Sequence, residues 1–238
     1  MKKFILIISL FFISITSQSQ VLITLLLGDK LNSDGLEFGL VGGGNWSTIS
    51  GFETKKSLST FNLGFYFDIR IKNQWSLYTG VLVKSNLGVN DFTLNDLSVL
   101  DADIYKNIDS IDVVGTYSQH MNYFLVPILL RYKFKNHIYI EGGTQLGLMY
   151  KSWVEFNADI DGRDGILKEY NREDLNKIDA GAMIGIGYKL MKGTGWTMGV
   201  KYYYGFVDVY KHISNTKNSS LFLELCIPIG AGEKPNKN

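Results

Sequence analysis

Large apolar residues alternate with small or polar residues along most of the chain from Leu36 onward. The segment 61–71 is the clearest case, because its odd positions are all large and apolar and its even positions are small or polar. A period of two residues is the pattern of a β-strand whose two faces meet different surroundings. The pattern predicts eight strands, at 36–47, 60–72, 75–89, 121–134, 137–151, 178–190, 195–207 and 219–229.

The connections between these strands alternate between short and long. Strands two and three, four and five, and six and seven are joined by two to four residues, which is short enough for tight turns. The other connections are rich in Asn, Asp, Ser, Lys and Gly and cover 48–59, 90–120, 152–177 and 208–218. This alternation is typical of a barrel with tight periplasmic turns and extended outer loops. The sequence therefore predicts an all-β fold, a transmembrane antiparallel up-and-down β-barrel of about eight strands.

The two faces of the predicted strands differ in composition. One face is large and apolar and carries no charged residue, whereas the other combines glycines with charges of both signs. In a soluble barrel the apolar face would fill the interior, and the glycines would then lie on the open surface, where nothing requires them. Exposing one Arg or Lys at the bilayer midplane costs about 2–4 kcal/mol. The charged face is therefore expected to line the lumen of a membrane barrel.

The predicted lumen charges are expected to form a structural network and not a conduction path, since about eight strands leave an interior that side chains just fill. The predicted members are Glu37, Asp68, Arg70, Lys84, Arg131, Glu141, Lys151, Asp179, Lys201 and Glu224. Cys226 also faces inward by parity and is expected to be an inert core residue. Pro127 lies inside strand four, where it removes a backbone donor, and so predicts a bulge or an inward-side break.

Aromatic residues at the strand ends are expected at the membrane interfaces. Trp75 and Trp196 each follow a short turn, and Trp46 ends the first strand. We expect these three residues and Tyr188 to form an aromatic girdle. Trp153 begins the loop after strand five and is off the outward parity, so it belongs either to the girdle or to the loop.

The N-terminus has the pattern of a secretory signal peptide. Lys2 and Lys3 precede an unbroken apolar run from Phe4 to Ile15, and a polar segment with small residues follows. The run is shorter than the roughly 18 to 20 residues that a membrane-spanning helix needs. The predicted organisation is a signal peptide at 1–19, an N-terminal periplasmic segment at 20–35, an outer-membrane barrel at 36–230 and a polar C-terminal tail at 231–238.

Composition and charge narrow the possible partners. The 238 residues include 25 Gly, 3 Pro and 13% aromatic residues, a bias toward sheet and turn. Lys and Arg number 24 against 23 Asp and Glu, and the resulting charge of +1 gives no field that attracts nucleic acid. The single cysteine forms no internal disulfide. We expect outer-membrane lipid and an unknown extracellular or envelope protein as partners, and no nucleic acid.

Five segments carry a likeness to a known family. They are 38–47 at the start of the barrel, 126–132 in strand four, 141–147, 185–188 and 199–202. In these segments the chain resembles the PorT-like family of outer-membrane β-barrel proteins. The resemblance covers nearly the whole mature chain and implies a barrel in the bacterial outer membrane. The segments are strand patterns and not catalytic signatures, and the chain departs from the common barrel ending because 230–238 follows the last strand without a terminal aromatic residue.

One acidic segment is a candidate calcium site. Asn157, Asp159 and Asp161 match the first half of an EF-hand loop, and Asp164 adds a further oxygen donor. The twelfth position of the loop, where an EF-hand has glutamate, is Lys168. A solvated acidic loop without metal is the alternative that we favour.

One histidine raises the question of catalysis. His120 lies near Ser118 and Asp112 in the sequence, which would suit a hydrolase at the outer rim, but no nucleophile elbow or metal spacing accompanies it. We therefore expect no catalytic site and no cofactor. The first hypothesis is a non-enzymatic outer-membrane protein with a structural or binding role in the cell envelope, through its loops or in secretion. A narrow porin-like transport channel and a rim-located lipid-modifying hydrolase are the alternatives.

Overall fold

A computed structural model gives the fold and describes residues 35–105, 107–108, 111–112, 114–160, 163–193 and 195–229. The predicted signal peptide, the C-terminal tail and all but the last residue of the periplasmic segment lie outside the described residues. The strands are β1 Leu36–Ile49, β2 Leu58–Lys72, β3 Trp75–Val89, β4 Asn107–Ile108, β5 Ile111–Asp112, β6 Gly115–Lys133, β7 Ile138–Ile160, β8 Arg163–Glu169, β9 Ile178–Lys189, β10 Thr197–Asp208 and β11 Lys217–Pro228. The helical segments are α2 Leu94–Val99, η1 Arg172–Asp174 and α3 Leu190–Gly193. Among the described residues, no helix is long and apolar enough to cross a membrane.

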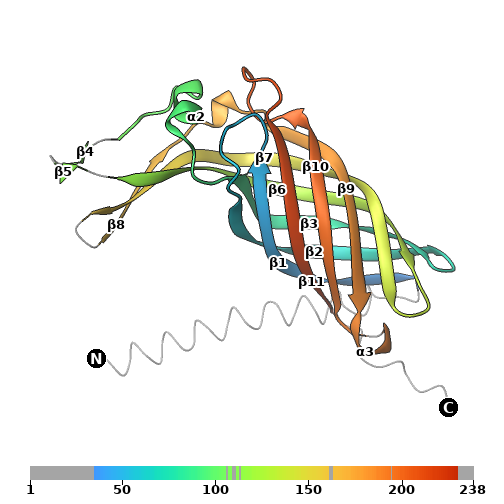
Figure 1. The fold of residues 1–238 in the computed structure, drawn as a ribbon. Coiled ribbons are helices and arrows are strands. Elements are labelled where there is room, and N and C mark those ends of the chain that lie inside the picture. The colour runs from blue at the N-terminus through green and yellow to red at the C-terminus, as the bar shows by residue number, and fades with distance from the viewer. Residues whose placement is uncertain are drawn as a thin grey trace, which may run out of the picture.

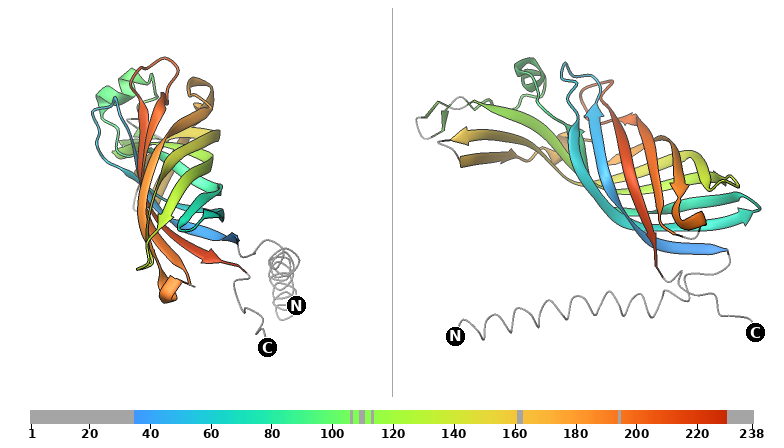
Figure 2. Two further views of the ribbon diagram at one scale, coloured as in Figure 1. Left: turned by 90° about the vertical axis from the view of Figure 1, so that its right-hand side faces the viewer. Right: turned by 60° about the horizontal axis from the view of Figure 1, so that its bottom comes forward.

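Eight of the strands close into one antiparallel ring (Figures 1 and 2), in the order β1, β2, β3, β6, β7, β9, β10, β11. Pairing of β6 with β7 and of β1 with β11 completes the ring. The predicted all-β up-and-down barrel is therefore confirmed. Strand β3 coincides with the predicted range 75–89, and the other ring strands overlap their predicted ranges.

The short and the long connections lie at opposite ends of the barrel (Figure 1). One end holds the β2–β3 and β6–β7 turns, α3, the start of β1 and the end of β11, and we call it the turn end. Asn73 and His137 have positive φ angles of 52° and 68° in the two tight turns, a conformation in which Asn and His are enriched. The other end, which we call the loop end, holds α2, β8 and the β10–β11 connection.

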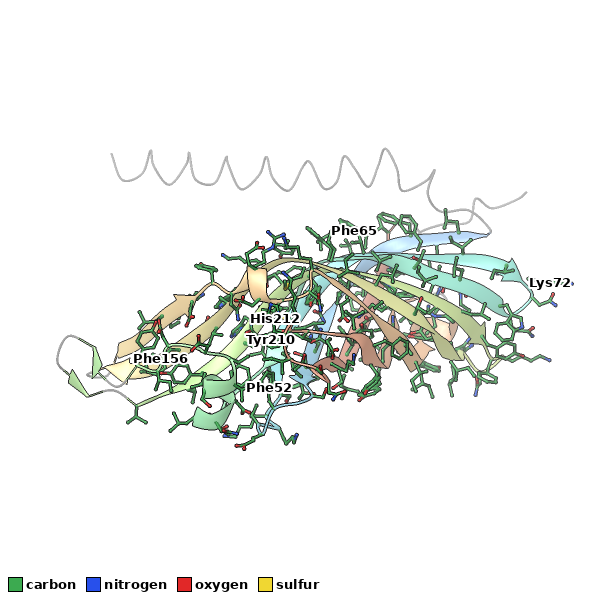
Figure 3. The ribbon with its side chains drawn as sticks, turned by 90° about the horizontal axis from the view of Figure 1, so that it is seen from above. Phe52, Phe65, Lys72, Phe156, Tyr210 and His212 are labelled. Atoms are coloured by element: carbon green, nitrogen blue, oxygen red, sulfur yellow. The ribbon has the colours of Figure 1, made fainter. Side chains whose placement is uncertain are left out.

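The apolar positions of the ring strands point out of the barrel. Phe61, Ile184 and Phe206 are 54%, 65% and 60% exposed, whereas the inward positions Asn62 and Tyr203 are each 1% exposed. Figure 3 shows Phe65 on the outside in the same way. A continuous apolar exterior of this kind suits lipid and not water.

The four predicted girdle residues lie on this exterior near strand ends. Trp75, Tyr188 and Trp196 are at the turn end, while Trp46 lies near the end of β1 toward the loop end. Their side chains are 40–45% exposed. Amphipathic rings at these two levels are positioned for the two membrane interfaces.

Two β-bulges interrupt the alternation of the strands. In β3 the pairing with β6 shifts between Leu82 and Ser85, and in β7 the pairing with β6 skips Tyr150. A bulge inserts one residue and reverses the face that later residues take. Lys84 and Lys151, which were predicted to face the lumen, therefore point outward and are exposed. The prediction is wrong for these two lysines because parity cannot be carried across a bulge.

Pro127 lies in β6 with its side chain buried. Its pairing with β7, opposite Gln145, continues without a shift. On the other side, the β3–β6 ladder skips from Thr79 to Leu82, beside the residue that has no N–H to donate. The predicted break is thus a gap in one ladder, and the bulge of β3 follows directly after it.

Strands β6 and β7 continue past the ring and, with β8, form an extension that projects from the loop end (Figures 1 and 2). Strand therefore occupies part of the predicted loops 90–120 and 152–177. Figure 3 places Phe156 of the extension and Lys72 of the turn end at opposite ends of the molecule. The rings of Tyr105 and Tyr117 lie 5.4 and 4.6 Å from that of Phe156, so the chain after α2 covers one face of the extension.

Inward-facing glycines allow neighbouring strands to approach closely. A Cβ at Gly43 would lie 1.8 Å from the carbonyl oxygen of Leu223, whereas a Cβ at the outward-facing Gly42 would meet contacts of 3.5 Å or more. We expect Gly43→Ala to lower the free energy of unfolding by about 1–3 kcal/mol and Gly42→Ala to change it by less than about 0.5 kcal/mol. Urea unfolding in lipid vesicles measures both, and equal stabilities would contradict the close-packing argument.

Candidate functional site

The interior of the barrel holds buried charges grouped around Arg131. Its Nη1 lies 2.8 Å from Oδ2 of Asp68, and its Nη2 lies 2.7 Å from Oε2 of Glu141. The guanidinium carbon lies 4.2 and 4.0 Å from the ring centroids of Tyr78 and Tyr139. All five side chains are buried. A buried guanidinium is tolerated when carboxylates and rings surround it in this way.

Lys201 extends the group across the lumen. Its Nζ lies 3.3 Å from Oε1 of Glu141 and 2.7 Å from Oε2 of Glu224, and Lys133 lies 2.7 Å from Asp68. Strands β2, β6, β7, β10 and β11 each supply a member, so these ion pairs join neighbouring strands and strands that are separated by a single strand of the ring. We call this set the lumen cluster; it consists of Asp68, Arg131, Lys133, Glu141, Lys201 and Glu224.

The other predicted lumen residues lie apart from the lumen cluster. Glu37 forms an ion pair with Lys189, and Asp179 accepts a hydrogen bond of 2.9 Å from Asn218. Arg70 lies near the β2–β3 turn and is exposed. The structure thus brings five of the ten predicted residues into one cluster, and it adds Lys133 to them.

At the loop end, Gln119 joins several connections through its side-chain amide. It is fully buried, and its Oε1 accepts hydrogen bonds of 2.6 Å from the Tyr210 hydroxyl and 2.8 Å from Asn171 Nδ2. Its Nε2 donates to the Ser152 hydroxyl at 2.8 Å and to the Trp153 carbonyl at 3.1 Å. Gln119 therefore holds η1 and the β10–β11 connection against β6 and β7.

Asp96 plays a similar part in α2. Its carboxylate accepts backbone N–H bonds from Glu53 at 2.7 Å, Thr54 at 3.1 Å and Thr93 at 3.0 Å. Burial alone would raise the pKa of Asp96, but these three donors together lower it below the ordinary range. The carboxylate therefore stays charged at neutral pH and ties the β1–β2 connection to α2.

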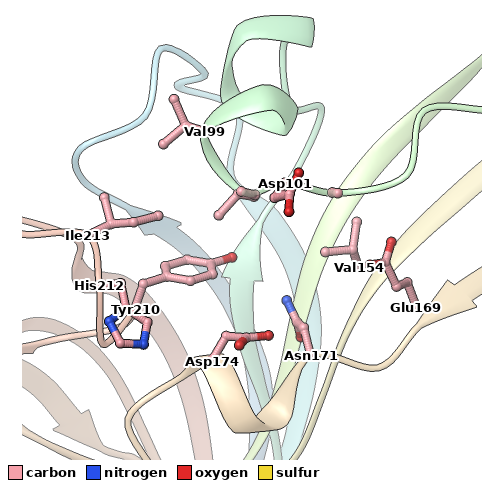
Figure 4. A pocket seen from close by; sticks show the side chains of 11 residues that line it. Val99, Asp101, Val154, Glu169, Asn171, Asp174, Tyr210, His212 and Ile213 are labelled. Atoms are coloured by element: carbon pink, nitrogen blue, oxygen red, sulfur yellow. The ribbon is translucent and has the colours of Figure 1, made fainter.

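A cavity of about 260 Å³ lies between these connections (Figure 4). Its walls are the chain that follows α2, the end of β8 with η1, and the β10–β11 connection. The lining combines apolar side chains with three carboxylates, an imidazole and a phenol, and consists of Val99, Leu100, Asp101, Ala102, Val154, Glu169, Asn171, Asp174, Tyr210, His212 and Ile213. Cavities that pair apolar surface with a few convergent polar groups are suited to ligand binding. We call it the loop-end cavity.

The segment of the candidate calcium site is a β-hairpin. Asn157 and Asp159 lie on β7, Asp164 lies on β8 opposite Asp159, and Asp161 lies outside the described residues. An EF-hand needs a twelve-residue loop between two helices, so the EF-hand interpretation is wrong. Within the described ranges, no three His, Cys, Asp or Glu side chains gather as they would around a metal ion.

Ser118 and His120 have separate partners. The Ser118 hydroxyl donates to Asn90, and the His120 ring stacks on Trp153 with the centroids 5.1 Å apart. The side chain of Asp112 lies outside the described part of the chain. Among the described contacts, none joins the serine to the histidine as a nucleophile and its base.

Comparison with known proteins agrees with this architecture. A family model described as an outer membrane protein β-barrel domain matches residues 17–211. The chain belongs to this family. The protein is therefore located in the bacterial outer membrane, and the apolar exterior of its ring strands faces lipid.

Solved structures of other outer-membrane proteins are similar to this member of the family. Ail, the attachment invasion locus protein of Yersinia pestis, is 11% identical with a TM-score of 0.42, over 82% of this chain and 99% of that chain. Neisserial surface protein A is 13% identical with a TM-score of 0.38, over 82% and 99%. OprG from Pseudomonas aeruginosa is 12% identical with a TM-score of 0.34, over 82% and 93%. No curated protein matches the chain.

Several residues of the interior and of the loop end were missing from the sequence prediction. Lys133 and Lys189 lie on the inward parity of β6 and β9, so parity carried to the strand ends would have found both. Tyr117, Gln119 and Met121 lie at every second position and point to the same side of the strand. This period of two is a strand signal, although the segment up to residue 120 was predicted to be a loop. Tyr210 carries no such signal, because its position depends on how the β10–β11 connection folds back.

Proposed function

We propose that this family member is a non-enzymatic barrel whose loop end faces outside the cell and binds an extracellular or envelope partner. The observation that carries the proposal is the loop-end cavity, because three separate connections build it. Hydrogen bonds to Gln119 and Asp96 hold the surrounding connections in place. A preformed cavity loses little conformational entropy on binding, which favours affinity.

The likeness to PorT-like proteins supports a role in secretion or in another envelope process. On this proposal the loops contact a protein of the envelope, and the barrel serves as a membrane-fixed support for them. The lumen cluster contributes rigidity, since its ion pairs join β2, β6, β7, β10 and β11. Loops on a rigid scaffold are a common arrangement for binding sites.

A narrow transport channel is the alternative, and the lumen cluster argues against it. Arg131, Glu141 and Lys201 are 3%, 6% and 1% exposed, and a barrel of about eight strands has an interior that side chains just fill. We expect the purified protein to give no stable single-channel currents in planar bilayers. Large, stable currents would favour transport over loop-mediated binding.

A rim hydrolase is the second alternative. The separate partners of Ser118 and His120 supply no activated nucleophile among the described residues. Binding therefore has more support than catalysis.

Site-specific photocrosslinking on intact cells tests the proposed function. The photoreactive residue p-benzoylphenylalanine replaces Ile213 in the cavity wall, and a matched control places it at the exposed Lys135 of the β6–β7 turn. We expect a discrete adduct from position 213 and none from position 135. Ala102→Trp, which fills the cavity, should abolish the adduct. Equal adducts with and without this cavity-filling substitution would contradict binding at the loop-end cavity.

A further inference from the structure

The outer surface of the barrel carries lysines just beyond its apolar band at the loop end. The bulges of β3 and β7 turn Lys84 and Lys151 onto this surface, and Lys168 of β8 lies on it as well. Two independent bulges thus bring cationic side chains to the same outer face. We call this surface the cationic face, and it consists of Lys84, Lys151 and Lys168 together with the ring of Trp153.

Aromatic rings hold two of these ammonium groups in place. Nζ of Lys151 lies 5.5 Å from the ring centroid of Trp153 and 5.1 Å from that of Tyr170. Nζ of Lys168 lies 5.0 Å from the Trp153 centroid and 3.3 Å from Oε2 of Glu155. Cation–π contacts of this kind orient an ammonium group while leaving it charged. The face is therefore partly ordered before any ligand arrives.

Lys84 and Lys151 belong to no ion pair among the described residues. Within the described side chains, no carboxylate lies within 4.0 Å of either ammonium group. Their strands are separated by β6 alone, so the two backbones are about 10 Å apart, twice the spacing of neighbouring strands. Two long lysine side chains at this spacing can approach one anionic group.

The depth of the cationic face in the membrane follows from the residues directly below it. Val83, Phe124 and Tyr150 are the neighbouring exterior residues, and they are 37%, 40% and 39% exposed. Lys84 and Lys151 follow Val83 and Tyr150 in the sequence and lie where the apolar band ends. Lipid headgroups occupy this level of a membrane. The chain after α2 covers the face of the extension that is opposite to the cationic face (Figure 1).

We propose that the cationic face is a binding site for the phosphate group of a phosphorylated lipid headgroup in the outer leaflet. Lysine binds phosphate as a point charge, and each lysine near an anionic membrane surface contributes about fivefold to binding. The site is continuous with the lipid-facing band of the barrel, which brings such headgroups against it. The assignment to the outer leaflet rests on the proposed orientation of the loop end, whereas the recognition of phosphate does not.

Native mass spectrometry of the full-length protein in detergent micelles tests the proposal. The probes are monophosphoryl lipid A, the same lipid after removal of its phosphate, and inorganic phosphate. We expect the wild-type protein to retain monophosphoryl lipid A, and Lys84→Gln with Lys151→Gln to weaken retention by about 30-fold. Lys72→Gln with Lys135→Gln makes the same change of charge at the turn end and should leave retention unchanged. Slower migration after boiling on SDS gels verifies that each variant is folded.

Three results would overturn the proposal. Retention that is unaffected by the substitutions at Lys84 and Lys151 would show that the cationic face is not the site. Equal losses in the two double variants would show an effect of net charge alone. Equal retention of the dephosphorylated lipid, or displacement of the lipid by inorganic phosphate at equal concentration, would show that a phosphorylated headgroup is not what is recognised. None of these results depends on a partner at the loop-end cavity, so this test and that of the proposed function can fail separately.

Discussion

Replacing Arg131 with methionine is expected to lower the free energy of unfolding of the barrel by about 3–5 kcal/mol, because removing one member of a buried ion pair leaves the other charge without its partner. Here two carboxylates lose contacts of 2.8 and 2.7 Å, those of Asp68 and Glu141. Each keeps one ammonium partner, Lys133 and Lys201 respectively. The effect should therefore lie near the lower end of that range, about 3 kcal/mol.

A double variant separates lost pairing from lost packing at this position. Arg131→Met with Glu141→Gln leaves two balanced pairs, Asp68 with Lys133 and Glu224 with Lys201. We expect it to be more stable than Arg131→Met alone, although it carries one more substitution. Urea titration in lipid vesicles, followed by tryptophan fluorescence, measures both variants. If the double variant is the less stable of the two, the destabilisation does not come from an unpaired carboxylate.

The ring of the barrel could be predicted because the chain repeats one simple signal. In 61–71 each outward residue is large and apolar, because every second residue of a membrane-spanning strand contacts lipid. Short and long connections alternate along the chain, which is typical of an up-and-down barrel. In such a barrel each ring strand pairs with the next one along the chain, so the order of the strands follows. Neither signal depends on a particular tertiary contact, which is why the predicted ranges, such as 75–89 for β3, agree with the structure.

The interior and the loop end were less predictable for two physical reasons. A bulge changes the backbone without any marker in the composition, so Lys84 and Lys151 were assigned to the wrong face. The second reason is the assumption that strands end where the membrane ends. Residues 154–160 alternate between apolar and polar side chains as clearly as the spanning strands do, and they continue β7 well beyond the barrel.

The lumen cluster shows which features of the interior can be predicted from strand parity and which cannot. Parity alone placed Asp68, Arg131, Glu141, Lys201 and Glu224 on the inner face. It could not show which carboxylate meets which cation, because some partners lie on strands that are not hydrogen-bonded to each other, such as β2 and β6, which are separated by β3. Partner choice depends on strand tilt and side-chain length, which are properties of the closed barrel.

Replacing Gln119 with leucine is expected to loosen the loop end while leaving the ring of strands folded. Leucine is close to glutamine in size but makes no hydrogen bond, so Tyr210 and Asn171 lose the acceptor at 2.6 and 2.8 Å. Leaving a buried donor unpaired costs about 1–3 kcal/mol. Amide exchange at Val209 and Tyr210, whose N–H groups bond to Thr216, should accelerate by about 10-fold or more.

A matched control for this variant lies in the barrel itself. Gln145 is also buried, but among the described residues its Nε2 has no hydrogen-bond partner, so Gln145→Leu should leave exchange at Tyr210 unchanged. Tyr210→Phe removes the hydroxyl that Gln119→Leu leaves unpaired. The double variant Gln119→Leu with Tyr210→Phe should therefore be less affected than the sum of the two single changes. Strictly additive effects, or equal acceleration in Gln145→Leu, would show that the amide of Gln119 does not hold the β10–β11 connection against the barrel.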